Sequence, residues 1–182
     1  MTLLGVIADT HIPDRMRRLH PKVIPLFKDL GVETILHAGD VSIPRVLEEL
    51  GEIAPVYAVR GNRDFWRLRY LPAFVDLEFN GVPMVLAHGQ GRWWNYLASK
   101  VQYLAYGLQP ERYKRQLVQT FPHARVIIFG HIHIPINDWV SGRLLFNPGT
   151  ACCPEVNKLP PSVGLLHVNA GGEVRGEIVY LG

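Results

Sequence analysis

The chain has 182 residues, a length typical of one compact domain with a full hydrophobic core. Its 48% hydrophobic and 19% charged residues exclude a disordered or fibrous protein. The net charge of +3 is too small to indicate a nucleic-acid-binding protein. The apolar runs are far shorter than the ~20 residues that cross a bilayer, and the N-terminus lacks the pattern of a signal peptide. We therefore expect a single cytoplasmic domain over residues 1–182.

Strand-like and helix-like segments alternate in the first part of the chain. The expected strands are 3–8, 34–38 and 55–60, and the expected helices are 21–30 and 43–51. This alternation predicts parallel βαβ units.

From Phe74 onward the pattern changes to hairpins. The dipeptide Asn80-Gly81, a strong hairpin signal, separates the expected strands 74–79 and 82–87. Two further strand pairs flank short turns: 136–140 with 144–146, and 163–168 with 174–181. Residues 125–129 form another apolar run. Two sheets packed face to face, with helices outside, would accommodate both halves of the chain.

A helical insertion is expected near residues 90–122. Its first segment has apolar residues at helical spacing together with surplus tyrosines, and its second segment spans 110–121. The insertion is interpreted either as a helical hairpin packed on a sheet or as a lid or homo-oligomer contact, because exposed aromatic patches often mark interfaces. The adjacent Cys152 and Cys153 are expected to be reduced, since a disulfide between neighbours would be strained.

Seven residues able to bind metal each follow an apolar run closely. They are Asp9, His11, Asp40, Asn62, His88, His131 and His133. Layered α/β folds place ligands at the carboxyl ends of their strands, so we expect these side chains to converge. Asp9 and His11 reach one ion only if the backbone turns as it leaves the strand.

The residue types narrow the choice of metal. Oxygen and nitrogen ligands without a thiolate suit Mn²⁺, Fe, Zn²⁺, Ni²⁺ or Co²⁺ better than Ca²⁺ or an iron–sulfur cluster. The Asp40 carboxylate could bridge two divalent ions, for which Mn²⁺ is the first choice and Mg²⁺ a further option. Four arginines around Asn62 are either solvated or attract an anionic substrate: Arg60, Arg63, Arg67 and Arg69.

The order of these motifs resembles the calcineurin-like metallophosphoesterase superfamily. The matching segments are Asp9-Thr10-His11, Gly39-Asp40, Gly61-Asn62-Arg63-Asp64, His88-Gly89 and Gly130-His131-Ile132-His133. The short chain and Asn147-Pro148-Gly149-Thr150 resemble the small phosphodiesterases of the YfcE/MJ0936 type. The resemblance implies a four-layer α/β/β/α sandwich of two mixed sheets.

The resemblance also implies two metal sites that share Asp40. One ion would be held by Asp9, His11, Asp40 and His133, and the other by Asp40, Asn62, His88 and His131. Such a centre hydrolyses phosphate esters with a hydroxide held between two ions. Asp40, Asn62, Arg63 and His88 are the expected catalytic residues, and the expected partner is a small phosphate ester rather than nucleic acid.

Several neighbours of the motifs are expected to support them. Thr10 and the Asn147 loop either hold ligating histidines or merely form turns, and His37 is either buried in the core or close to the ligands. Asp64 either orients Arg63 or caps the segment that follows it.

Arg63 departs from the family pattern, in which a histidine protonates the leaving group or binds phosphate. Arginine remains protonated and cannot act as a general acid, but it can bind phosphate. This difference leaves open an interaction scaffold resembling Vps29. A nuclease of the Mre11/SbcD branch is a third option, although those proteins carry extra segments.

Overall fold

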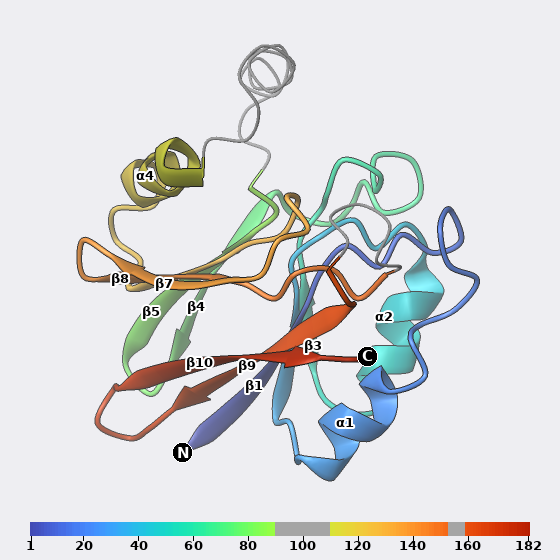
Figure 1. Ribbon diagram of the computed structural model, residues 1–182, viewed down its shortest axis with the longest axis horizontal. Coiled ribbons are helices and arrows are strands. Elements are labelled where there is room, and N and C mark those ends of the chain that lie inside the picture. The colour runs from blue at the N-terminus through green and yellow to red at the C-terminus, as the bar shows by residue number, and fades with distance from the viewer. Residues whose placement is uncertain (90–109, 153–158) are drawn as a thin grey trace.

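The computed structural model describes residues 1–89, 110–152 and 159–182, in which ten strands form two five-stranded sheets (Figure 1). The first sheet has the order β10 (Val174–Tyr180), β9 (Ser162–Val168), β1 (Thr2–Ile7), β2 (Thr34–His37) and β3 (Val56–Ala58). The second has the order β4 (Phe74–Phe79), β5 (Val82–Ala87), β6 (Val126–Ile128), β8 (Arg143–Asn147) and β7 (Ile136–Val140). Both sheets are mixed, since each contains parallel and antiparallel pairs.

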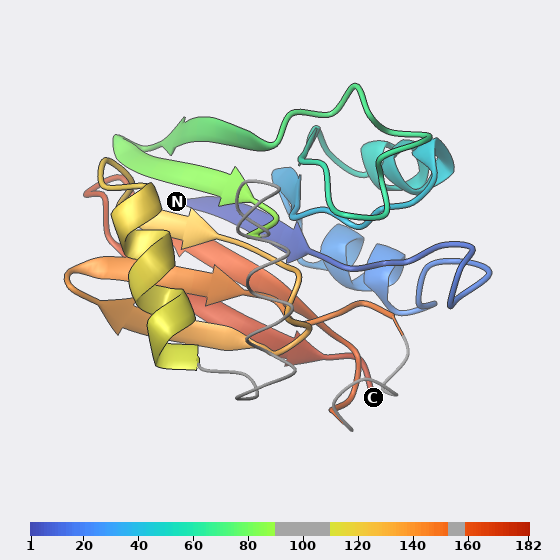
Figure 2. The same cartoon turned by 90° about the horizontal axis from the view of Figure 1, so that it is seen from above.

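Helices cover the outer face of each sheet, which confirms the expected four-layer sandwich. Figure 1 shows α1 (Val23–Asp29) and α2 (Pro44–Gly51) on one side of the molecule and α4 (Pro110–Thr120) on the other. Helices α1 and α2 bury Phe27 and Leu50 against the first sheet, whereas α4 buries Leu117 against the second. Figure 2 shows α4 lying across its sheet.

The middle layer explains why the strand runs are continuously apolar. In β1, Leu4 and Val6 pack toward the second sheet, while Ile7 packs toward the helices. Side chains of a strand alternate between its two faces, and here both faces are buried. The two sheets meet through residues such as Leu86 and Phe146, which have no exposed surface.

The hairpin turns agree with the sequence. Asn80 and Gly81 have φ values of 51° and 75°, and Ser141 and Gly142 have values of 50° and 74°. Positive φ at both central residues is the requirement of a type I′ turn. Some expected elements were too long: the strand expected over 55–60 is Val56–Ala58, and the helix expected over 21–30 is Val23–Asp29.

The expected helical insertion is only partly described. Its second segment is α4, which begins at Pro110 as expected. The first segment, with the expected lid or oligomer contact, lies outside the described residues. Cys152 is buried, and Cys153 also falls in an undescribed range. Among the helices that the structure describes, none has the length and apolar character needed to cross a membrane.

Candidate metal centre

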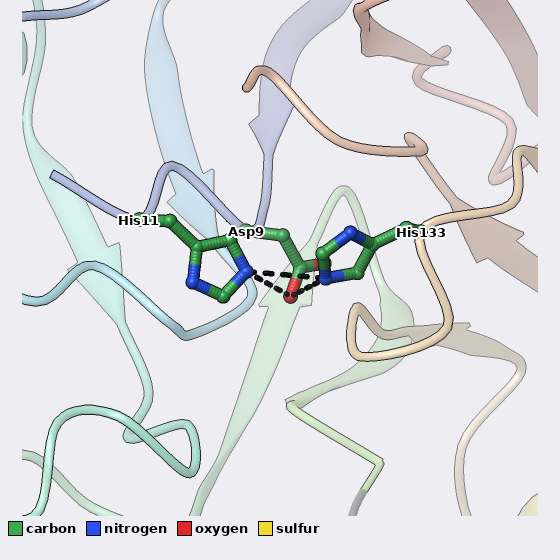
Figure 3. Close-up of side chains that lie close together, drawn as sticks. All are labelled: Asp9, His11 and His133. Carbon is green, nitrogen blue, oxygen red and sulfur yellow. Dashed lines mark hydrogen bonds and ion pairs between the residues drawn. The ribbon is translucent and has the colours of Figure 1, made fainter. Parts of the chain in front are cut away.

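Three of the expected ligand residues converge at the ends of β1 and β6. The Nε2 atoms of His11 and His133 lie 3.1 Å apart. The Asp9 Oδ1 atom is 3.3 Å from His133 Nε2 and 3.8 Å from His11 Nε2. Figure 3 shows both rings directed at this carboxylate. A metal with ~2.1 Å ligand bonds places adjacent ligand atoms about 3.0–3.4 Å apart, so two of these three distances suit a shared cation and the Asp9–His11 distance is somewhat longer.

A second group adjoins the first and shares Asp9. Ligand atoms of Asp9, Asp40 and His88 all lie within 4.8 Å of one another. The Asp40 Oδ2 atom is 3.7 Å from His11 Nε2, whereas its Oδ1 atom is 3.6 Å from His88 Nε2. The two oxygens of Asp40 therefore face different histidines, which is the placement a bridging carboxylate needs.

The backbone at this edge has an unusual conformation. Five of the seven expected ligand residues have positive φ: Asp9 (52°), His11 (49°), Asp40 (54°), His131 (73°) and His133 (57°). The left-handed region costs a residue with a side chain roughly 1–2 kcal/mol, and such residues cluster at functional sites. The expected turn of the backbone between Asp9 and His11 is thus present.

The main chain fixes the orientation of His88. Its Nδ1 atom lies 2.7 Å from the Ala38 carbonyl oxygen, so Nδ1 carries the proton and donates it. The Nε2 atom is then left with its lone pair facing Asp40. Gly39 is needed for this approach, because a Cβ at that position would lie 2.6 Å from His88 Nδ1.

Several buried polar atoms at the site have no hydrogen-bond partner among the described residues. They include Asp9 Oδ1, Asn62 Oδ1 and His88 Nε2. Buried polar atoms are nearly always satisfied in proteins, and an isolated buried lone pair is costly. All three atoms are electron-pair donors, so the residues present fit a divalent cation.

The electrostatics of the site agree with that fit. Burial lowers the pKa of His11 to about 3, which keeps its imidazole neutral and able to bind metal. Burial opposes ionisation of Asp9, but its interaction with His133 and with the other nearby histidines lowers its pKa overall. Burial raises the pKa of Asp40, a cost that an adjacent cation would offset.

The remaining expected residues lie at the same edge. The ring of His131 packs against that of His88, with centroids 5.1 Å apart. Asn62 is half-buried in the loop after β3, and the next backbone N–H, that of Arg63, donates to Asp40 Oδ1 at 2.9 Å. The Arg63 guanidinium is exposed and pairs with Asp14 at 3.2 Å.

The contacts of Thr10 and Asn147 are to loops and to the non-ligand His37, which favours the second of the two expectations for these residues. The Thr10 hydroxyl lies 3.4 Å from the Asp40 carbonyl oxygen and 3.3 Å from His37 Nε2. Asn147 donates to the Gly130 carbonyl oxygen at 2.9 Å and so supports the turn that begins at His131.

Asp64 has a role that the sequence did not indicate. It is fully buried, and its carboxylate accepts hydrogen bonds from the backbone N–H groups of Ser42 and Gly61, both at 2.7 Å, and of Val41 at 3.3 Å. It therefore neither orients Arg63 nor simply caps the following segment. It ties the Asp40 loop to the Asn62 loop.

His37 is buried and provides a test of the site's electrostatics. Burial lowers its pKa from 6.5 to about 4. Between these values the unfolded chain binds more protons, so stability falls as pH decreases from 6.5 to 4, by about 3 kcal/mol from this group. We expect urea unfolding of metal-free protein to show this fall, with a shallower slope in His37→Gln. If stability depended on pH equally in wild type and in His37→Gln, the lowered pKa of His37 would be contradicted.

Comparisons with known proteins agree with this geometry. The model of the calcineurin-like phosphoesterase superfamily domain matches residues 2–171. A probable metallophosphoesterase of Methanothermobacter thermautotrophicus is 35% identical over 181 residues, covering 99% of this chain and 93% of that protein. Phosphodiesterase MJ0936 of Methanocaldococcus jannaschii is 25% identical over 176 residues, covering 90% and 91% of the two chains.

A solved structure shows the same fold. The crystal structure of a single mutant of Vps29 from Entamoeba histolytica superposes with a TM-score of 0.74 at 21% identity, covering all of both chains. Because the family model spans nearly the whole sequence, the chain belongs to the calcineurin-like phosphoesterase superfamily.

Proposed function

We propose that this protein is a metal-dependent phosphodiesterase with two divalent ions, Mn²⁺ being the first candidate. The observation that carries the proposal is a pair of adjoining ligand groups. One consists of Asp9, His11 and His133, and the other consists of Asp9, Asp40 and His88. The family and its phosphodiesterase relative support the same reaction. Bound ions would supply a hydroxide between them and neutralise the phosphoryl oxygens.

The proposed ligand assignment is the one that the family resemblance implies. One ion would be held by Asp9, His11, Asp40 and His133, and the other by Asp40, Asn62, His88 and His131. The 3.1 Å approach of His11 to His133 supports the first set. The separate directions of the two Asp40 oxygens support its position between the ions.

The protein's own residues hold the reacting groups in place. The Ala38 carbonyl keeps His88 in one tautomer, and Asp64 fixes the two loops that carry Asp40 and Asn62. Arg63 lies beside Asp40 with an exposed guanidinium. Since arginine does not release its proton, its role is to bind phosphate oxygens, and solvent water protonates the leaving group.

Arg63→Ala is expected to raise KM for phosphodiesters by about tenfold, because a charge-assisted bond to phosphate contributes roughly 1.5–3 kcal/mol and this one is partly exposed. Steady-state kinetics with a phosphodiester measure the change. Arg45→Ala, which removes an exposed arginine on α2 paired with Glu49, is the matched control. An unchanged kcat/KM with every substrate would exclude this role for Arg63.

The activity itself is tested with bis-p-nitrophenyl phosphate and p-nitrophenyl phosphate. Protein stripped by a chelator is supplied with Mn²⁺, Ni²⁺ or Mg²⁺, and p-nitrophenol release is followed. We expect turnover that depends on added metal and is faster for the diester. Absence of turnover with every metal would favour the non-catalytic interaction scaffold.

A further inference from the structure

The loop that follows β3 has an unusual surface composition. Between residues 63 and 70, every exposed residue is an arginine or an aromatic: Arg63, Phe65, Trp66, Arg67, Arg69 and Tyr70. Trp66 is 85% exposed and Phe65 is 61% exposed. Exposing large rings forgoes the stabilisation that their burial would give, so the sequence of this loop is not explained by folding.

The base of the 63–70 loop is anchored. Asp64 accepts three backbone hydrogen bonds, and Leu68 is fully buried in the core under α1 and α2. The Leu68 N–H donates to the Asp64 carbonyl oxygen at 3.0 Å. Between these two anchors Phe65 and Trp66 pack edge to face, with centroids 5.9 Å apart. The exposed rings are therefore held on a fixed base.

The same loop adjoins the candidate metal centre at Arg63. The Arg63 N–H donates to Asp40 Oδ1 at 2.9 Å. Three residues of chain place the Trp66 Cα within about 11 Å of the Arg63 Cα. Figure 1 shows this loop, in blue-green, at the same end of the molecule as the loop that follows β1, in blue.

The charges of the loop match an anion. It presents three exposed arginines, of which Arg63 pairs with the exposed Asp14 of a neighbouring loop, whereas its only carboxylate, Asp64, is buried and accepts hydrogen bonds from backbone N–H groups. Arginine binds phosphate oxygens, and exposed aromatic rings interleaved with arginine stack on nucleobases. A ligand that combines a phosphodiester with a planar base would use both features.

We propose that the 63–70 loop is a recognition site for the nucleobase of a phosphodiester substrate, with Trp66 as the stacking residue. This inference rests on the proposed phosphodiesterase function. It adds the substrate class: a small nucleoside phosphodiester, whose phosphate lies at the metal centre beside Arg63 and whose base lies on Trp66.

The test compares two diesters with the same leaving group, thymidine 5′-(p-nitrophenyl phosphate) and methyl p-nitrophenyl phosphate. Stacking is worth ~1–3 kcal/mol per base, so Trp66→Ala should lower kcat/KM for the thymidine ester by about fivefold or more, mainly through KM. The methyl ester should change by less than about twofold. Trp66→Phe should retain most of the preference, and Trp139→Ala, at an exposed position on edge strand β7, should leave it unchanged.

An equal effect of Trp66→Ala on both esters overturns the inference. A change from dimer to monomer in sedimentation, with the ester preference intact, also overturns it and assigns the rings to an interface between two copies. If the wild-type protein hydrolyses neither ester, the proposed function fails separately. Equilibrium dialysis then decides the inference without turnover: wild type but not Trp66→Ala should bind adenosine 5′-monophosphate more tightly than methyl phosphate.

Discussion

Asp40→Asn is expected to weaken Mn²⁺ binding more than 100-fold and to abolish phosphodiester hydrolysis. Substituting residues that merely hold a metal ligand costs ~10–100-fold in affinity, and Asp40 faces both groups of ligands directly. Asparagine preserves the shape and one oxygen but removes the negative charge that two cations need between them. Metal content after dialysis and a calorimetric titration with Mn²⁺ measure the loss.

Two controls separate this effect from unfolding. Asp29→Asn, at an exposed position on α1, should bind metal normally. Burial raises the pKa of Asp40, so removing its charge should leave the metal-free protein at least as stable in urea as wild type. Wild-type affinity for two ions in Asp40→Asn would show that Asp40 is not between them.

Asp64→Ala is expected to lower the free energy of unfolding by about 3 kcal/mol. The change leaves three backbone N–H groups without their acceptor, and each unsatisfied buried donor costs roughly 1–3 kcal/mol. Losing a buried carboxylate offsets part of this cost. Urea unfolding measures the effect, and metal affinity should fall as well because the Asp40 loop is no longer tied to Gly61.

The matched variants for this prediction are Asp64→Asn and Asp14→Ala. Asparagine keeps one acceptor oxygen, so its loss of stability should be intermediate. Asp14 is exposed and, among the residues that the structure describes, forms an ion pair with the exposed Arg63 guanidinium alone, so its removal should change the unfolding midpoint little. A midpoint for Asp64→Ala equal to that of wild type would show that the three contacts contribute nothing.

Local signals predicted most of the strands and turns. Alternating and continuous apolar runs report burial on one or both faces, and Asn80-Gly81 defines its own hairpin. The position of the C-terminal hairpin was not predictable in the same way. Strand β9 pairs with β1 at the other end of the chain, with Thr2 opposite Val168, and no local pattern encodes that partner.

In the candidate site, too, some features could be predicted from the sequence and others could not. Each expected ligand residue follows a strand, so its approximate place could be inferred from chain order and the rule that strand ends converge. The hydrogen-bond acceptor for His88 is the main-chain carbonyl of Ala38. Because every residue has a main-chain carbonyl, the sequence does not identify this acceptor. The role of Asp64 likewise depends on backbone N–H groups from another loop. Contacts to the backbone leave no signature in residue identity.

The distribution of ligand residues between the two sheets has a mechanical consequence. Asp9, His11 and Asp40 follow strands of the first sheet, whereas His88 and His133 follow strands of the second. Each ligand group draws on both sheets. A cation held there would cross-link the two sheets, and a shift of one sheet relative to the other would lengthen its bonds to the ligands. The packing of the middle layer, to which Phe146 belongs, would therefore influence the distances between ligands that come from different sheets.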